Sequence, residues 1–203
     1  NLKTGTIEKV LANETPRCSI AYGGSSFYVR NQKLVLTTKE SSLLYVKLEG
    51  NQQSVSLDKS SFVGNPYILH QSPHCLFLKE DDNCCNIYIT PLDKSWPSLK
   101  LTENPWYAFR YSVSYDDQYL AWQEWQEDQM PWQESVIKIA TLKKRSDSQK
   151  PYQLNHFYTL KRKDYSFSCP LFSPSAHKLG YLSDLSGWRS LWVYSIPEKK
   201  SIH

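Results

Sequence analysis

The side chains best suited to binding a ligand lie close together in this sequence, between residues 124 and 134. The segment reads Glu-Trp-Gln-Glu-Asp-Gln-Met-Pro-Trp-Gln-Glu. Two tryptophans, a methionine and a proline beside several carboxylates are unusual for a mere surface loop. One interpretation is a protrusion that meets another domain or presents carboxylates to a ligand. The other is a loop folded onto its own sheet with its indole rings packed down.

The sequence contains no self-contained active site. No GxSxG nucleophile elbow occurs, and there is no HExxH, P-loop or dinucleotide fingerprint. His70 and His74 are four residues apart, which suits metal binding on a helix, but the local pattern predicts a hairpin turn. The run from Glu80 to Asn83 lacks the glycine and the terminal glutamate of a calcium loop. We therefore expect no metal and no cofactor, and an independent hydrolase with an unrecognised site is disfavoured.

Four segments of the chain share one pattern, in which turn-forming residues separate an apolar residue from a leucine seven positions later. The apolar residue and its leucine are Phe27 and Leu34, Leu69 and Leu76, Val113 and Leu120, and Phe172 and Leu179. A second apolar strand begins 10, 11, 17 and 12 residues after these leucines, at Leu44, Ile87, Ile137 and Leu191. Each unit is therefore expected to contain a hairpin followed by a further strand.

The spacing of the units predicts an all-β fold, a β-propeller of about four blades in a partial or truncated ring. The four leucines recur at intervals of 42, 44 and 59 residues, and a period of 40–50 residues is typical of propeller blades. The expected blades are 22–62, 63–106, 107–160 and 161–203, with 1–21 as the end of a preceding blade. An irregular β-sandwich is the alternative. Segment 124–134 then falls at an insertion within the third blade.

Composition limits the partners and the compartment. The net charge is +4, and the basic runs are short and lie between apolar segments, so no nucleic-acid surface is expected. No apolar stretch is long enough to span a membrane. The five cysteines form an odd set without a CxxC pair, which favours a reducing, cytoplasmic location. Exposed sheet edges in an incomplete ring would favour a homo-oligomer.

Three groups of residues resemble a known family in their order and spacing. They are Tyr22-Gly23-Gly24, Leu120–Trp125 with Met130–Trp132, and Phe172–Pro174 leading through Tyr181–Asp184 to Ser186–Trp188. The chain resembles the propeller of the prolyl-oligopeptidase family of serine peptidases, specifically its acylaminoacyl-peptidase and dipeptidyl-peptidase-like bacterial branch. The family usually has Asp-Gly where Ser175-Ala176-His177 stands, and often a second aromatic where Arg189 stands. These departures suggest a divergent member.

The resemblance implies a propeller that gates access for short peptides, followed in the parent chain by a catalytic α/β-hydrolase domain. We expect that domain to be absent from this chain, which would be non-catalytic by itself. The resemblance also implies candidates for facing the substrate chamber or the hydrolase domain: Glu124, Trp125, Met130, Pro131 and Trp132. A carboxylate there could pair with a peptide's α-amino group. Arg110 is a further candidate, with a structural salt bridge as its alternative role.

A second function hypothesis comes from a different class of protein. Propellers are common binding scaffolds, and fold alone does not decide function. A stand-alone propeller that serves as a protein-interaction module is therefore the alternative to the gating domain of a peptidase.

Overall fold

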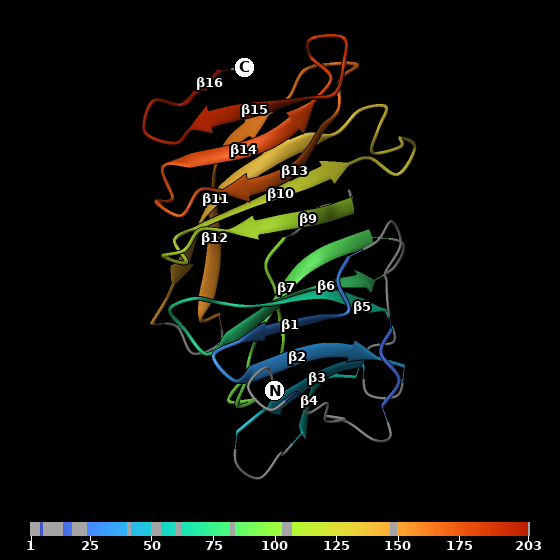
Figure 1. The fold of residues 1–203 in the computed structure, drawn as a ribbon, viewed down its shortest axis with the longest axis vertical. Coiled ribbons are helices and arrows are strands. Elements are labelled where there is room, and N and C mark those ends of the chain that lie inside the picture. The colour runs from blue at the N-terminus through green and yellow to red at the C-terminus, as the bar shows by residue number, and fades with distance from the viewer. Residues whose placement is uncertain are drawn as a thin grey trace.

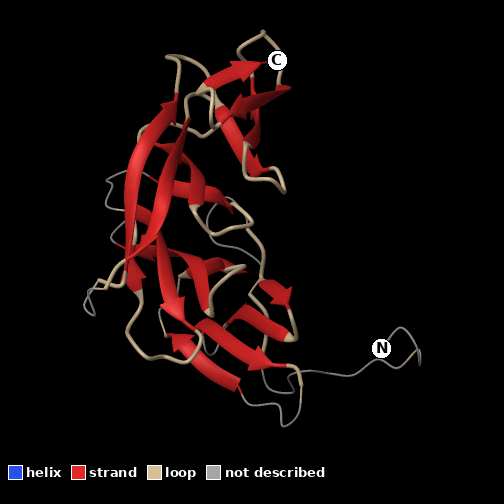
Figure 2. Cartoon of the chain, turned by 90° about the vertical axis from the view of Figure 1, so that its left-hand side faces the viewer, coloured by secondary structure: helices blue, strands red, loops and turns tan. Residues whose placement is uncertain are grey.

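The protein is built from β-strands in every part that the structure describes. A computed structural model describes residues 5, 14–17, 24–39, 42–49, 54–59, 62–81, 84–102, 107–146 and 150–202. These residues form four four-stranded antiparallel sheets and no helix, so none of them forms a helix able to cross a membrane (Figures 1 and 2). The all-β, propeller-type fold predicted from the sequence is confirmed.

Each sheet is a simple meander whose strands follow one another in chain order. The first sheet contains β1 (Phe27–Arg30), β2 (Lys33–Thr38), β3 (Ser42–Lys47) and β4 (Ser54–Asp58). The second contains β5 (Val63–Ile68), β6 (His74–Asp81), β7 (Cys84–Pro91) and β8 (Leu99–Lys100). The third contains β9 (Tyr107–Val113), β10 (Tyr119–Trp125), β11 (Val136–Lys144) and β12 (Tyr152–Leu160). The fourth contains β13 (Phe167–Phe172), β14 (Lys178–Ser183), β15 (Ser190–Ser195) and β16 (Lys200–Ile202).

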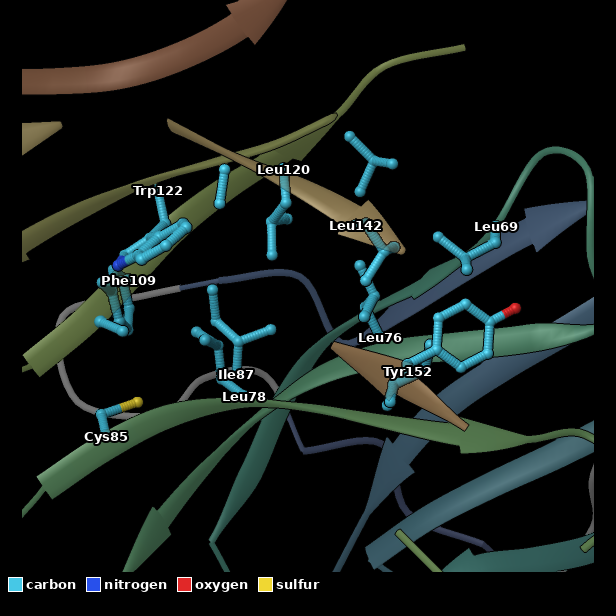
Figure 3. Packing of buried hydrophobic residues seen from close by; sticks show 14 of the residues in the cluster. Leu69, Leu76, Leu78, Cys85, Ile87, Phe109, Leu120, Trp122, Leu142 and Tyr152 are labelled. Atoms are coloured by element: carbon cyan, nitrogen blue, oxygen red, sulfur yellow. The ribbon is translucent and has the colours of Figure 1, made fainter. Parts of the chain in front are cut away.

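The hydrophobic core lies between the sheets, because each sheet packs its apolar faces on its neighbours. Alternate residues of β6 illustrate this: Leu76 and Leu78 point to the third sheet, whereas Phe77 packs toward the first. The cluster between the second and third sheets is drawn in Figure 3, where Trp122 lies across from Ile87. Another cluster joins the third and fourth sheets. Burial on both faces explains why the middle strands are near-continuous apolar runs.

The four sheets follow one another along the long axis of the molecule, with the first and the fourth at opposite ends (Figure 1). The described part is therefore an open arc of blades and not a closed ring. The first strand of each sheet is its inner strand, since β1 lies beside β5 and β9 lies beside β13. Residues 1–21, expected to end a preceding blade, lie outside the described residues except for 5 and 14–17, and so do Tyr22 and Gly23.

The first hairpin differs from the expected pattern. Its turn contains only Asn31 and Gln32, whose φ values of 45° and 57° are both positive, as in a type I′ turn. Phe27 consequently pairs with Leu36, whereas the sequence repeat aligned it with Leu34. In the third and fourth sheets the aligned residues do pair, Val113 with Leu120 and Phe172 with Leu179.

Three inner strands carry a β-bulge at corresponding places. In β9, Arg110 and Tyr111 together face the single residue Trp122 of β10. The same two-against-one arrangement occurs at residues 65–66 of β5 and 169–170 of β13. The first residue of each bulge has a positive φ, 51° at Asn65, 42° at Arg110 and 55° at Cys169. A bulge redirects the side chain it carries and often lies beside a functional site.

Candidate functional site between the third and fourth sheets

The loop between β10 and β11, residues 126–135, is folded down onto the fourth sheet. The Pro131 carbonyl accepts hydrogen bonds from the Ser135 hydroxyl (3.0 Å) and from the Ser166 hydroxyl (2.8 Å). Two tight turns close the loop, with Gln129 N donating to Gln126 O and Gln133 N to Met130 O. The middle of the loop is therefore held at the start of β13.

Ser135 fixes the base of this loop. Its side chain is buried, accepts a hydrogen bond from the Phe167 amide (3.1 Å) and accepts another from the Gln123 side-chain amide (3.1 Å). The Phe167 amide also donates to the Ser135 carbonyl (3.2 Å). These contacts join β10, the loop and β13, so the position of the loop depends on the packing of the third sheet against the fourth.

A pocket of about 200 Å³ opens beside this loop. It is lined by Phe109, Arg110, Gln123, Trp125, Pro131, Trp132, Ser166, Ser168 and Arg189. The lining comes from β9, β10, the 126–135 loop, the start of the fourth sheet and the turn before β15. We call this hollow the Arg110–Arg189 pocket.

One wall of the pocket is aromatic. Trp125 is 3% exposed and stacks on Tyr107 with the ring centroids 5.8 Å apart. Phe109 meets the Trp125 ring edge to face at 5.7 Å. Trp132, by contrast, is 61% exposed and stands at the rim. The pocket thus has an apolar wall and an exposed indole ring at its rim.

Two guanidinium groups give the pocket a positive charge. Arg189 Nη2 donates to the Ser168 hydroxyl (2.7 Å), and Arg110 Nη1 donates to Cys169 Sγ (3.0 Å). Among the described residues, no carboxylate lines the pocket. Within the described part of the chain, neither arginine makes a salt bridge, and the structural salt bridge considered for Arg110 stays a prediction. Fixed positive charge beside apolar walls favours anionic ligands.

The structure corrects the role expected for Glu124. Its side chain is completely buried, with Oε1 2.8 Å from Lys138 Nζ and Oε2 accepting a hydrogen bond from Trp122 Nε1 at 2.9 Å. Both carboxylate oxygens are thus engaged inside the third blade, and a peptide amino group has no access to them. Glu124 borders a separate small hollow of about 70 Å³.

The other sequence candidates divide between the pocket and its surroundings. Arg110, Trp125, Pro131 and Trp132 line the pocket, whereas Met130 lies outside its lining, 41% exposed. The base of the loop is packed down and Trp132 is exposed at its tip, and a contact of this loop with another domain or a ligand stays a prediction.

Several lining residues were not singled out from the sequence. The sequence pattern that could have indicated Ser166 and Ser168 is weak. It consists of a serine on either side of a buried phenylalanine at the start of a strand. Gln123 stands at an alternate position of an apolar strand, and polar residues buried there need partners. Arg189 was noted only as a departure from the family pattern.

A second polar cluster lies at the opposite end of the inner strands. The His70 ring contacts the Arg30 guanidinium and the Tyr67 hydroxyl, and packs on Tyr115 with centroids 4.7 Å apart. Asp117 of the third sheet accepts hydrogen bonds from the amides of His70 (2.8 Å) and Gln71 (2.6 Å). These contacts run between blades, which gives the cluster a structural role.

Burial lowers the pKa of His70, and the neighbouring Arg30 lowers it further, while Asp117 raises it. Burial also lowers the pKa of His74, helped by Lys144 and opposed by Asp93. Among the described residues, no three His, Cys, Asp or Glu side chains gather where they could hold a metal ion.

Comparison with known proteins finds similarity in fold among solved structures. A scan of protein-family models finds no match, and neither does a search of curated proteins. Solved structures do match. A puromycin-hydrolysing peptidase of Mycobacterium tuberculosis is 15% identical with a TM-score of 0.71, over 95% of this chain and 32% of that one. A puromycin hydrolase mutant complexed with PGG is similar over the same shares, with 15% identity and a TM-score of 0.73.

Other propellers are similar over most of the chain as well. A prolyl endopeptidase is 14% identical with a TM-score of 0.58, over 87% of this chain and 28% of that one. A putative TolB from Agrobacterium tumefaciens is 16% identical with a TM-score of 0.57, over 93% and 60%. At these identities the similarity establishes the β-propeller fold. The chain spans about a third of the length of the puromycin-hydrolysing peptidases.

Proposed function

We propose that this chain is the propeller domain of a serine peptidase of the prolyl-oligopeptidase family, where it admits short peptides to a catalytic α/β-hydrolase domain. The observation that carries the proposal is the similarity to two puromycin-hydrolysing peptidases over 95% of the chain. The sequence motifs that resemble the same family support it independently. In this role the propeller contributes access and binding, and the hydrolase domain contributes the nucleophile.

The pocket agrees with a role in binding rather than in catalysis. A nucleophilic serine needs a base within hydrogen-bond reach and an oxyanion site beside it. Ser166 and Ser168 instead bond the Pro131 carbonyl and the Arg189 guanidinium, and no histidine of the described part lines the pocket. The residues there are suited to holding one end of a ligand.

The proposal is tested with the complete protein that the gene encodes. We expect its reading frame to supply a GxSxG serine, and the protein to hydrolyse aminoacyl and dipeptidyl p-nitroanilides while leaving denatured casein uncut. The 203-residue chain alone serves as the control and should hydrolyse neither substrate. A gene without a hydrolase domain, or casein cleaved as readily as the short substrates, would contradict the proposal.

A further inference from the structure

We propose that the Arg110–Arg189 pocket binds a carboxylate carried on a large apolar or aromatic residue, as at the free carboxyl terminus of a short peptide. That the ligand is a peptide rests on the proposed function. The requirement for a negative charge beside an apolar group rests on the pocket alone.

Two residues of β13 anchor the two arginines of the pocket. Arg189 is bonded to Ser168 and Arg110 to Cys169, and these two anchors are adjacent residues of one strand. Both guanidinium groups also line the Arg110–Arg189 pocket, although they come from different blades. Like charges that line one pocket repel each other, and a bound anion relieves that repulsion. A planar carboxylate also suits the fixed fork of an arginine.

Two β-bulges carry the residues of the contact between Arg110 and Cys169. Arg110 is the first residue of the bulge in β9, and Cys169 is the first residue of the bulge in β13, each with a positive φ. Such a conformation is uncommon for residues other than glycine, asparagine and aspartate. The same bulge occurs at Asn65 of β5, so it is a repeated feature of the inner strands, and in β9 and β13 it carries the two residues of the Arg110–Cys169 contact.

The remaining polar groups of the pocket are already engaged. The Ser166 hydroxyl donates to Pro131 O, and its amide donates to Asp184 Oδ1 (2.9 Å). The Gln123 side chain donates to the Ser135 hydroxyl. These groups hold the shape of the pocket. In contrast, each guanidinium makes one hydrogen bond to the surrounding described residues, out of the five N–H donors that an arginine offers.

Size and apolar walls define the rest of the ligand. The volume of about 200 Å³ is below the ~300–1,000 Å³ of pockets that enclose a whole drug-sized ligand. The pocket therefore receives one end of a ligand, about one residue. Trp125 and Phe109 supply an apolar wall, and the exposed Trp132 can lie against a side chain at the rim. A terminal aromatic residue with a free carboxylate satisfies both features.

The test measures binding to the 203-residue chain by titration calorimetry, using paired acids and amides. The probes are 3-phenylpropionate and its amide, and acetyl-glycyl-phenylalanine and its amide. We expect each amide to bind at least about tenfold more weakly than its acid, because a charge-assisted hydrogen bond is lost. Arg110→Gln and Arg189→Gln should each weaken the acids about tenfold. Arg145→Gln removes an exposed arginine outside the pocket and should change binding less than about twofold.

Thermal midpoints of the three variants, compared with that of the parent chain, show whether folding is retained. Acids and amides that bind equally, failure of both acids to bind, or an equal loss in Arg145→Gln would overturn the proposal. An amidated peptide with a glutamate side chain that binds as tightly as the free acid would overturn the assignment to the carboxyl terminus. Binding of 3-phenylpropionate without binding of the peptide acid would leave the anion site standing and count against the proposed peptidase function.

Discussion

Both carboxylate oxygens of Glu124 are held inside the third blade, one by Lys138 and the other by the Trp122 indole. A charge taken out of water must be compensated by an opposite charge or by hydrogen bonds. Here the compensation comes from two neighbouring side chains of the same sheet. Trp122 lies two residues before Glu124 on β10, and Lys138 of β11 is the residue that pairs with Trp122. Glu124 therefore contributes to the stability of the blade, whereas the exposed Trp132 contributes to the surface.

Replacing Glu124 with glutamine should lower the free energy of unfolding by about 2 kcal/mol, because the counter-charge 2.8 Å from Lys138 Nζ is lost. Urea unfolding followed by circular dichroism measures the change. Glu127→Gln, at an exposed position of the neighbouring loop, is the matched control and should be nearly neutral. Equal stability of the two variants would show that the buried pair contributes nothing.

Two histidines, His74 buried and His70 half-buried, predict how stability depends on pH. The folded-state pKa values of His70 and His74 are lowered from 6.5 by burial, so the unfolded chain binds protons more readily than the folded one. Stability is then fully present above pH 6.5 and is lost as the pH falls toward the folded-state values. Aspartate and glutamate titrate mainly below this window.

We expect the urea midpoint to be constant from pH 8 to 7 and to fall between pH 6.5 and 5.5. Replacing both histidines with glutamine should flatten this dependence, although it also lowers the plateau because the contacts of His70 are lost. His177→Gln, in an exposed turn, should keep the acid-induced loss. A midpoint in the parent chain that does not change across this window would contradict the assignment.

At the scale of the elements, the hairpin turns that follow β9 and β13 have the same backbone conformation, and the turn after β9 also contacts a neighbouring blade. Asp117 occupies the positive-φ position of the turn in the third sheet, with φ 57°, and Ala176 occupies the corresponding position in the fourth, with φ 62°. The two turns are closed alike, by Asp117 N donating to Ser114 O and Ala176 N donating to Ser173 O. Asp117 differs in that its side chain crosses to the second sheet.

Asp117→Gly should destabilise the chain by about 2 kcal/mol, because the two hydrogen bonds to the amides of His70 and Gln71 are lost. Glycine is chosen because it accepts a positive φ without strain. Ala176→Gly makes the same backbone change without removing an inter-blade contact, and should be close to neutral. Thermal or urea unfolding compares the two, and similar losses in both would mean that the contact across the blades is unimportant.

At the scale of the whole molecule, blade stacking determines which surfaces are covered. The second and third sheets have a core on both faces. The fourth packs one face on the third, while Leu191 of β15 and Ile202 of β16 remain 63% and 59% exposed. Stacking of the third blade on the fourth also creates the Arg110–Arg189 pocket, since the walls of the pocket belong to these two blades. The homo-oligomer expected from exposed sheet edges stays a prediction.

Much of the fold could be predicted from the sequence because the signal is local. Alternating apolar residues, turn formers and a spacing of 42 to 59 residues are properties of neighbouring positions, and they determine hairpins and blades. The repeat did not predict the register of the first hairpin, because the register depends on turn geometry: two residues of positive φ at Asn31 and Gln32 shorten the turn. Composition alone does not reveal that difference.

The sequence by itself determined the strands, the repeat and the unusual composition of segment 124–134, and through them the presence of Trp125, Pro131 and Trp132 near a site. Only the tertiary structure decided the charge of that site. In the folded chain Glu124 is buried against Lys138. Arg110 of the third blade and Arg189 of the fourth both contact strand β13. The physical reason is that charge pairing and the convergence of side chains depend on packing between blades, which joins residues far apart in the chain.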